Sequence, residues 1–124
     1  MEDTLYEQVG GQDFFERLVG KFYDVVATDE LLRPMYPEEL TESKHHFVLF
    51  LCQYWGGPRT YMAERGHPRL RMRHAPFRIT KPARDAWMSA MNAALESVRF
   101  ELTPKQFEEM SAYFETAAHQ MRNV

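Results

Sequence analysis

Apolar residues recur every three to four positions in four stretches of this 124-residue chain, and this spacing confines most of it to amphipathic helices. The first stretch begins near Asp13, where Glu16 three residues later resembles a capping pair, and continues to Val26. The second begins near Thr41 and ends at Gly56 and Gly57, because glycine accepts the left-handed backbone of a helix end. One face of this second helix should carry Phe47, Phe50, Leu51 and Tyr54.

The other two periodic stretches lie in the C-terminal half. One runs from about Thr80 to Arg99, and the other starts at Thr103, with Pro104 in its first turn and Gln106 completing a capping box. No stretch alternates apolar and polar residues as a strand would, and no hairpin dipeptide such as Asn-Gly is present. We therefore expect one all-α domain over residues 1–124, with four main helices and short helical pieces between them.

Composition narrows the class of protein. A net charge of −3 argues against general affinity for nucleic acid. The lone Cys52 cannot form an internal disulfide, and its apolar surroundings predict a buried, unreactive thiol. No signal peptide and no membrane-spanning apolar run is evident, so we expect a soluble cytoplasmic protein without membrane insertion.

The segment from Pro58 to Arg78 has little periodicity and is strongly basic. Its only acid is Glu64, and its arginines are Arg59, Arg65, Arg69, Arg71, Arg73 and Arg78. Long irregular segments in small domains are often functional, and Tyr61, Leu70, Met72 and Phe77 would anchor this one. The arginines could form a solvated basic face or bind an anion such as a carboxylate or phosphate. His74 lies near its end, and no zinc or nucleotide-binding motif accompanies it.

Three pieces of the chain resemble the group II truncated haemoglobins. They are residues 6–11 (YEQVGG), Phe22-Tyr23 followed by residues 32–37 (LRPMYP), and the run from Gln53 to Ile79 (QYWGGPRTYMAERGHPRLRMRHAPFRI). The resemblance implies a two-over-two helical sandwich around haem b (iron protoporphyrin IX), which agrees with the four expected helices. His74 matches the proximal histidine, which would bond the iron through Nε2 while a carbonyl or water holds Nδ1–H.

The same resemblance implies a distal site on the other side of the haem. Tyr23, Tyr36 and Trp87 match its three hydrogen-bond donors, although each taken alone would be an ordinary packing residue. Ser43 falls where many other globins place a distal histidine, and Phe47 would line the pocket one turn later. Other expected haem contacts are Tyr61, His46, Arg71, Met72, Phe77 and Met91.

The register of the distal helix is the one place where the chain departs from relatives of this family. Residues 38–46 are about one residue shorter than in some of them, which affects Ser43 and Phe47. His46 could then face a haem propionate, or His45 could turn toward the iron. We favour the alternative in which both histidines lie on the exposed face of the helix.

Three donors around a bound gas predict tight oxygen binding, because each hydrogen bond to a charged ligand slows its release. Carbon monoxide and nitric oxide would be further ligands. The resemblance makes nitric oxide dioxygenation or peroxide turnover the expected chemistry, supported by a reductase that the sequence does not identify. Storage or sensing of a diatomic gas is the alternative, and a haem-free arginine-rich domain binding anions or nucleic acid is a third. The sequence leaves open whether the chain forms a homodimer.

Overall fold

Four long helices account for most of the chain in the computed structural model, which describes residues 3–124 and contains no strand in that range. The elements are α1 (Leu5–Gln8), α2 (Gln12–Val26), η1 (Arg33–Met35), α3 (Thr41–Tyr54), α4 (Thr60–Arg65), α5 (Leu70–His74), α6 (Lys81–Ser97), η2 (Arg99–Glu101) and α7 (Pro104–Met121). The four predicted helices correspond to α2, α3, α6 and α7, so the all-α prediction is confirmed.

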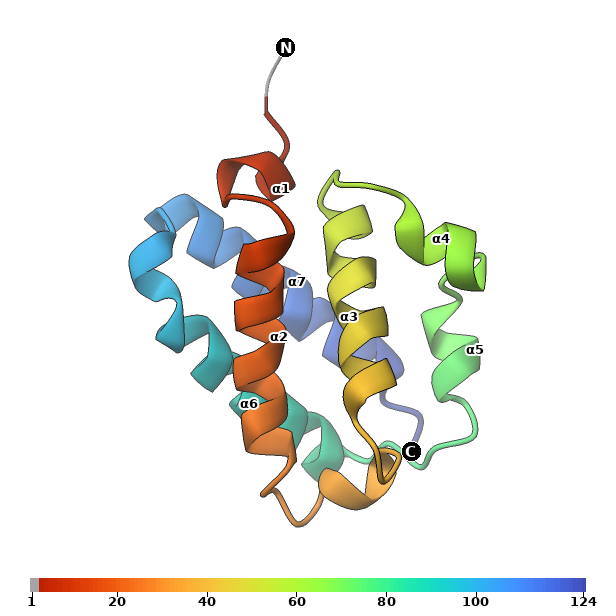
Figure 1. Ribbon diagram of the computed structural model, residues 1–124. Helices are drawn as coiled ribbons and strands as arrows, with labels where there is room; N and C mark the ends of the chain where they lie inside the picture. The colour runs from red at the N-terminus through yellow and green to blue at the C-terminus, as the bar shows by residue number, and fades with distance from the viewer. Residues whose placement is uncertain (1–2) are drawn as a thin grey trace.

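The long helices form two pairs. Helix α2 packs against both α3 and α6, and α6 packs against α7. In Figure 1, α2 and α3 run in opposite directions in front of α6 and α7. The short helices are attached to this frame, α4 to α3 and α5 to α7. The core between the pairs is rich in aromatic residues, and Phe14, Phe15, Phe22 and Phe114 are its largest fully buried side chains.

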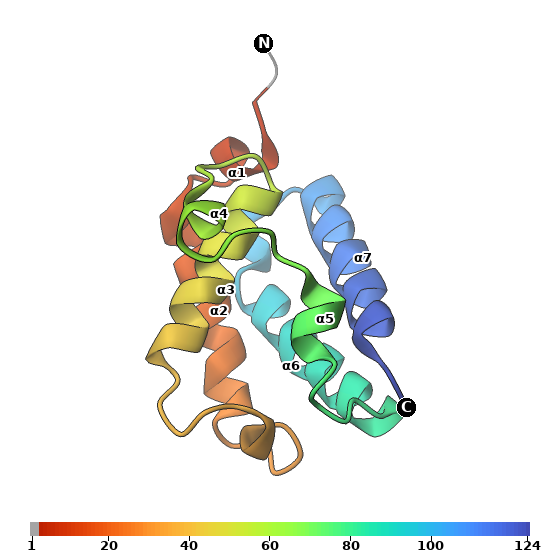
Figure 2. The same ribbon diagram turned by 90° about the vertical axis from the view of Figure 1, so that its right-hand side faces the viewer.

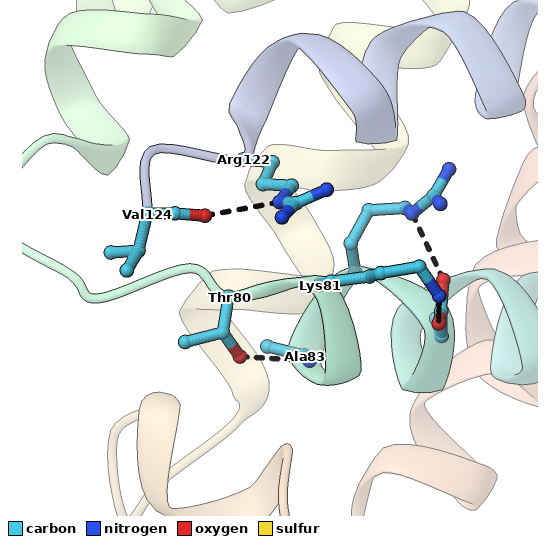
Figure 3. Close-up of polar contacts among 7 residues, drawn as sticks. Thr80, Lys81, Ala83, Arg122 and Val124 are labelled. Atoms are coloured by element: carbon cyan, nitrogen blue, oxygen red, sulfur yellow. Dashed lines mark hydrogen bonds and ion pairs between the residues drawn. The ribbon is translucent and has the colours of Figure 1, made fainter.

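Side-chain caps begin two of the long helices. The Thr80 hydroxyl accepts a hydrogen bond from the Ala83 N–H at 3.2 Å at the start of α6 (Figure 3). At the start of α7 the predicted capping box is confirmed. The Gln106 N–H donates to Thr103 Oγ1 at 3.1 Å, and the Thr103 N–H donates to Gln106 Oε1 at 2.9 Å.

The predicted capping pair of Asp13 and Glu16 is wrong. Helix α2 begins at Gln12, with Gly11 as its N-cap at a φ of 83°, and no side chain caps it. The Gly11 N–H instead donates to the carbonyl of Tyr6 at 2.9 Å, so the turn after α1 sets this helix end. Asp13 lies in the first turn, where its charge suits the helix dipole.

Helix α3 is apolar on two sides, and only part of the face expected from the sequence is buried in the core. Leu51 and Cys52 are buried in the core, whereas Phe47 and Phe50 are half-buried and Tyr54 is 51% exposed. The predicted buried thiol is confirmed, and burial raises the pKa of Cys52 to about 11. Two apolar sides blur the helical periodicity. The sequence pattern therefore did not show that the side with Phe47 and Phe50 is less buried than the side with Cys52.

None of the helices within residues 3–124 is long and apolar enough to cross a bilayer.

Candidate functional site

Four aromatic side chains from four different elements meet on one side of the core. Tyr23 comes from α2, Tyr36 from the loop after η1, Phe47 from α3 and Trp87 from α6. The rings of Tyr23 and Tyr36 lie edge to face with centroids 5.6 Å apart, and the centroids of Phe47 and Trp87 are 6.4 Å apart. Phe47 also packs edge to face on Tyr23 at 6.5 Å. The three residues predicted as distal donors therefore lie in one cluster together with Phe47.

Burial keeps the two tyrosine hydroxyls of this cluster protonated. It raises the pKa of Tyr36 to about 12, and the indole of Trp87, within hydrogen-bonding reach of that hydroxyl, opposes the rise. The pKa of Tyr23 is raised further, first by burial and then by Tyr36, while a hydrogen bond with Ser43 lowers it. Ser43 thus lies beside the Tyr23 hydroxyl. At neutral pH both phenols carry their proton and can donate it to a ligand.

The loop that carries Tyr36 is held by two side chains. Asp29 Oδ1 accepts hydrogen bonds from the N–H groups of Leu31 and Leu32, both at 2.9 Å, which shapes the turn after α2. The guanidinium of Arg33 then donates to the carbonyl of Pro37 at 2.8 Å and to that of Glu38 at 2.6 Å. These carbonyls lie directly after Tyr36.

Sequence reasoning did not single out Arg33. Its partners are backbone atoms in an irregular loop, which leave no pattern in the sequence.

His74 ends the short helix α5 with one ring nitrogen already engaged. Its Nδ1 lies 2.6 Å from the carbonyl oxygen of Leu70, one helical turn earlier, so Nδ1–H is the donor and Nε2 keeps its lone pair. Neighbouring apolar side chains are unusually exposed, with Met72 at 58% and Phe77 at 44%. The sequence predicted a carbonyl or water at Nδ1, and here the carbonyl of Leu70 lies at that atom.

Arg73 secures the start of α5. Its guanidinium donates to the carbonyls of Pro68 at 2.8 Å and Arg65 at 3.0 Å, so it braces the chain and is less available to an anion. Arg69, just before α5, has a φ of 43°, and its N–H donates to Nδ1 of His67 at 3.1 Å. Arg71 remains exposed on the outer surface.

The remaining predicted site residues are spread around this frame. Tyr61 is buried on α4, with its ring centroid 5.6 Å from that of Phe50 and the Arg65 guanidinium over its face. His46 is half-buried, and burial together with Arg65 lowers its pKa.

His45 and Met91 differ in how far they are exposed. His45 is exposed, with its Nε2 3.1 Å from a carboxylate oxygen of Glu64 on α4, so it does not point toward the cluster. Met91 has no exposed surface and belongs to the packed core.

Two hollows flank α5, which lies beside α7 in Figure 2. The larger, of about 690 Å³, is lined by Arg71, Met72, Phe77 and the end of the chain. The smaller, of about 400 Å³, is lined by Phe50, Tyr54, Leu70 and residues of α7. The distal cluster borders neither of these two hollows. Apolar walls with nearby arginines suit a flat organic group that carries carboxylates.

The single histidine also fits a metal whose other ligands belong to a bound cofactor. Within residues 3–124 no three His, Cys, Asp or Glu side chains are grouped to hold an ion. His74 offers a single oriented nitrogen beside exposed apolar side chains, as an iron porphyrin requires. The residues present therefore fit a haem group.

Comparison with known proteins assigns the family. Residues 4–123 match the model of the family described as bacterial-like globin. The group 2 truncated hemoglobin YjbI of Bacillus subtilis is 44% identical over 102 residues, which are 82% of this chain and 76% of that protein. The chain therefore belongs to the bacterial-like globin family, and the resemblance to group II truncated haemoglobins is confirmed.

Solved structures give the same result for the fold. The hemoglobin of the thermophilic phototroph Chloroflexus aurantiacus has a TM-score of 0.95 and 49% identity, covering 99% of this chain and 100% of that chain. The truncated oxygen-avid haemoglobin of Bacillus subtilis has a TM-score of 0.91 and 40% identity, covering 98% and 100%. The fold is thus that of a truncated globin, and membership of this family implies haem-based oxygen binding.

Proposed function

We propose that this chain binds haem b through Nε2 of His74 and holds dioxygen tightly with the donors Tyr23, Tyr36 and Trp87. When bound, haem supplies an iron centre that takes up diatomic gases and can exchange electrons with them. The observation that carries the proposal is the distal cluster, in which a buried and a half-buried phenol, both protonated, meet an indole N–H. Its support from relatives is the oxygen-avid haemoglobin of Bacillus subtilis, which is 40% identical.

Each residue has a distinct part in this proposal. The Leu70 carbonyl fixes the tautomer and rotation of His74, since the proton on Nδ1 is held at 2.6 Å. Met72 and Phe77 would cover the apolar faces and edges of the haem, and Arg71 could pair with a propionate. Tyr61 and His46 would border the haem from the side of α3 and α4.

On the distal side the hydroxyls act as donors because their pKa values lie far above neutral pH. A hydrogen bond to a ligand that has gained charge contributes roughly 1.5–3 kcal/mol, so each donor slows release about ten- to a hundredfold. Phe47 adds an apolar wall that keeps water from competing for these donors. A protein with two or three such donors releases oxygen slowly and suits chemistry on the ligand better than delivery.

The expected chemistry is nitric oxide dioxygenation, in which NO, O2 and one electron give nitrate, or the turnover of peroxide. A partner reductase would supply the electron. Storage or sensing of a gas is the competing function, and nitrate yield separates the two. Sustained nitrate production in the presence of a bacterial flavin reductase supports the enzymatic function, whereas a single turnover with intact oxygen binding supports storage or sensing.

Stopped-flow measurement of oxygen dissociation tests the donors. Tyr36→Phe and Trp87→Phe should each release oxygen at least about tenfold faster than the wild type. Tyr6→Phe is the matched control, because Tyr6 is also a half-buried tyrosine, but it lies on α1, where its ring stacks on that of Phe15. Rates within twofold of the wild type for both distal variants would refute the proposed role of the cluster.

A further inference from the structure

The end of the chain lies against the loop that joins α5 to α6, in both Figure 1 and Figure 2. Asn123 makes the contact with its backbone and its side chain. Its N–H donates to the Ile79 carbonyl at 3.0 Å, and its Oδ1 accepts from the Ile79 N–H at 2.9 Å. Its Nδ2 donates to the Phe77 carbonyl at 2.9 Å and lies 3.5 Å from the carbonyl of His74.

An asparagine side chain suits this position because it is donor and acceptor at once. Helix α5 has only five residues, and the carbonyls of Met72 and His74 at its end accept turn bonds from the N–H groups of Ala75 and Phe77. The Asn123 amide bonds one of the carbonyls beyond that end while it also satisfies the N–H of Ile79. One side chain thereby fixes the loop on both sides of Arg78.

The segment with His74 is thus held at its two ends by different side chains. Arg73 ties the start of α5 to the preceding turn through the carbonyls of Pro68 and Arg65. Asn123 ties the loop after α5 to the end of α7. We propose that Asn123 is a positioning residue for His74, which sets the direction of its imidazole toward bound iron and slows the loss of haem. This inference depends on the proposed binding of haem through His74.

The neighbouring residues do not share this contact. Arg122 bonds within the chain end, where its Nε donates to the Val124 carbonyl at 3.0 Å (Figure 3). A substitution of Arg122 therefore changes the chain end next to Asn123 without touching the loop after α5.

The test compares Asn123→Ala, Asn123→Asp and the control Arg122→Ala in the full chain. Amide hydrogen exchange of Ile79 in the haem-free protein measures the clamp itself. Transfer of haem to an excess of another apoglobin gives the release rate, and resonance Raman of the reduced haem-bound protein gives the iron–histidine stretching band. Asn123→Asp keeps the acceptor for the Ile79 N–H but replaces the donor nitrogen, so it isolates the bond to the Phe77 carbonyl.

We expect Asn123→Ala to release haem roughly tenfold faster, as the loss of two hydrogen bonds implies, with a shifted or broadened iron–histidine band. Asn123→Asp should shift the band in the same direction, and Arg122→Ala should match the wild type in all three measurements. If Asn123→Ala takes up haem and has the haem release rate and iron–histidine band of the wild type, the positioning role of Asn123 is overturned but the proposed function is not. A wild type that takes up no haem would overturn the proposed function as well, whatever the exchange rate of Ile79.

Discussion

Replacement of Arg33 tests how the distal donors are held in place. Its guanidinium makes two short bonds to the carbonyls of Pro37 and Glu38, at 2.8 and 2.6 Å, and thereby braces the loop that carries Tyr36. A hydrogen bond from a charged donor contributes about 1.5–3 kcal/mol, but both carbonyls are exposed to water, so about 1 kcal/mol each is the appropriate value. Arg33→Ala should therefore lower the free energy of unfolding by about 2 kcal/mol.

For a chain of this size that loss corresponds to a fall in Tm of roughly 6–12 °C. Oxygen dissociation should also accelerate, though less than in Tyr36→Phe, because the hydroxyl is loosened and not removed. Arg33→Lys should recover part of both effects, since a single ammonium group can reach one carbonyl but cannot span two. The assays are thermal unfolding of the haem-free protein and stopped-flow oxygen release.

Arg59→Ala is the matched control, because Arg59 is exposed and its guanidinium donates to the sulfur of Met62 and not to the loop that carries Tyr36. If Arg33→Ala has the Tm and oxygen dissociation rate of Arg59→Ala, the bonds of Arg33 do not hold the loop and the reasoning fails.

Two further predictions concern backbone packing and pH. Gly57→Ala should destabilise the fold by roughly 1–3 kcal/mol in urea unfolding, because the added Cβ would lie 2.6 Å from the Tyr6 ring and 2.8 Å from the Cys52 carbonyl. Gly20→Ala should instead stabilise the fold by about 0.5–1 kcal/mol, since nothing lies within 4 Å of a Cβ added at Gly20 in α2. Equal changes in the free energy of unfolding for the two variants would contradict the packing described. Burial, with a nearby arginine, lowers the pKa of His46 in the folded state, so the unfolded chain binds the proton more readily. The free energy of unfolding should fall as the pH drops through the ordinary histidine value of 6.5, and less steeply in His46→Gln; parallel pH profiles for the two proteins would rule this out.

Local sequence patterns predicted that the four long helices form. They did not predict where every helix begins or which of its sides is buried. The capping box of Thr103 and Gln106 was predictable because both partners lie within one turn. The start of α2 was not, because Gly11 bonds to a carbonyl of the preceding helix. The short helices α4 and α5 have too few residues for a periodic signal, and bonds from Arg73 to backbone carbonyls brace the turn between them.

For the site, the identity of the residues came from family resemblance and their arrangement from the structure. Tyr23, Tyr36 and Trp87 each read as ordinary packing residues until the fold brings them together. The bracing roles of Arg33 and Asn123 have no signature in the sequence, because their partners are backbone atoms that every residue possesses.

The central claim is ligation of haem by His74, and absorption spectra test it most directly. Wild type, His74→Ala and the control His119→Ala would be mixed with haem and recorded in the ferric state and then reduced under carbon monoxide. His119 is the matched control because it is an exposed histidine on α7 that borders neither hollow beside α5. We expect a sharp Soret band and a carbon monoxide spectrum for wild type and His119→Ala, lost or altered in His74→Ala. Spectra of His74→Ala identical to those of the wild type would place the iron ligand elsewhere and contradict the claim.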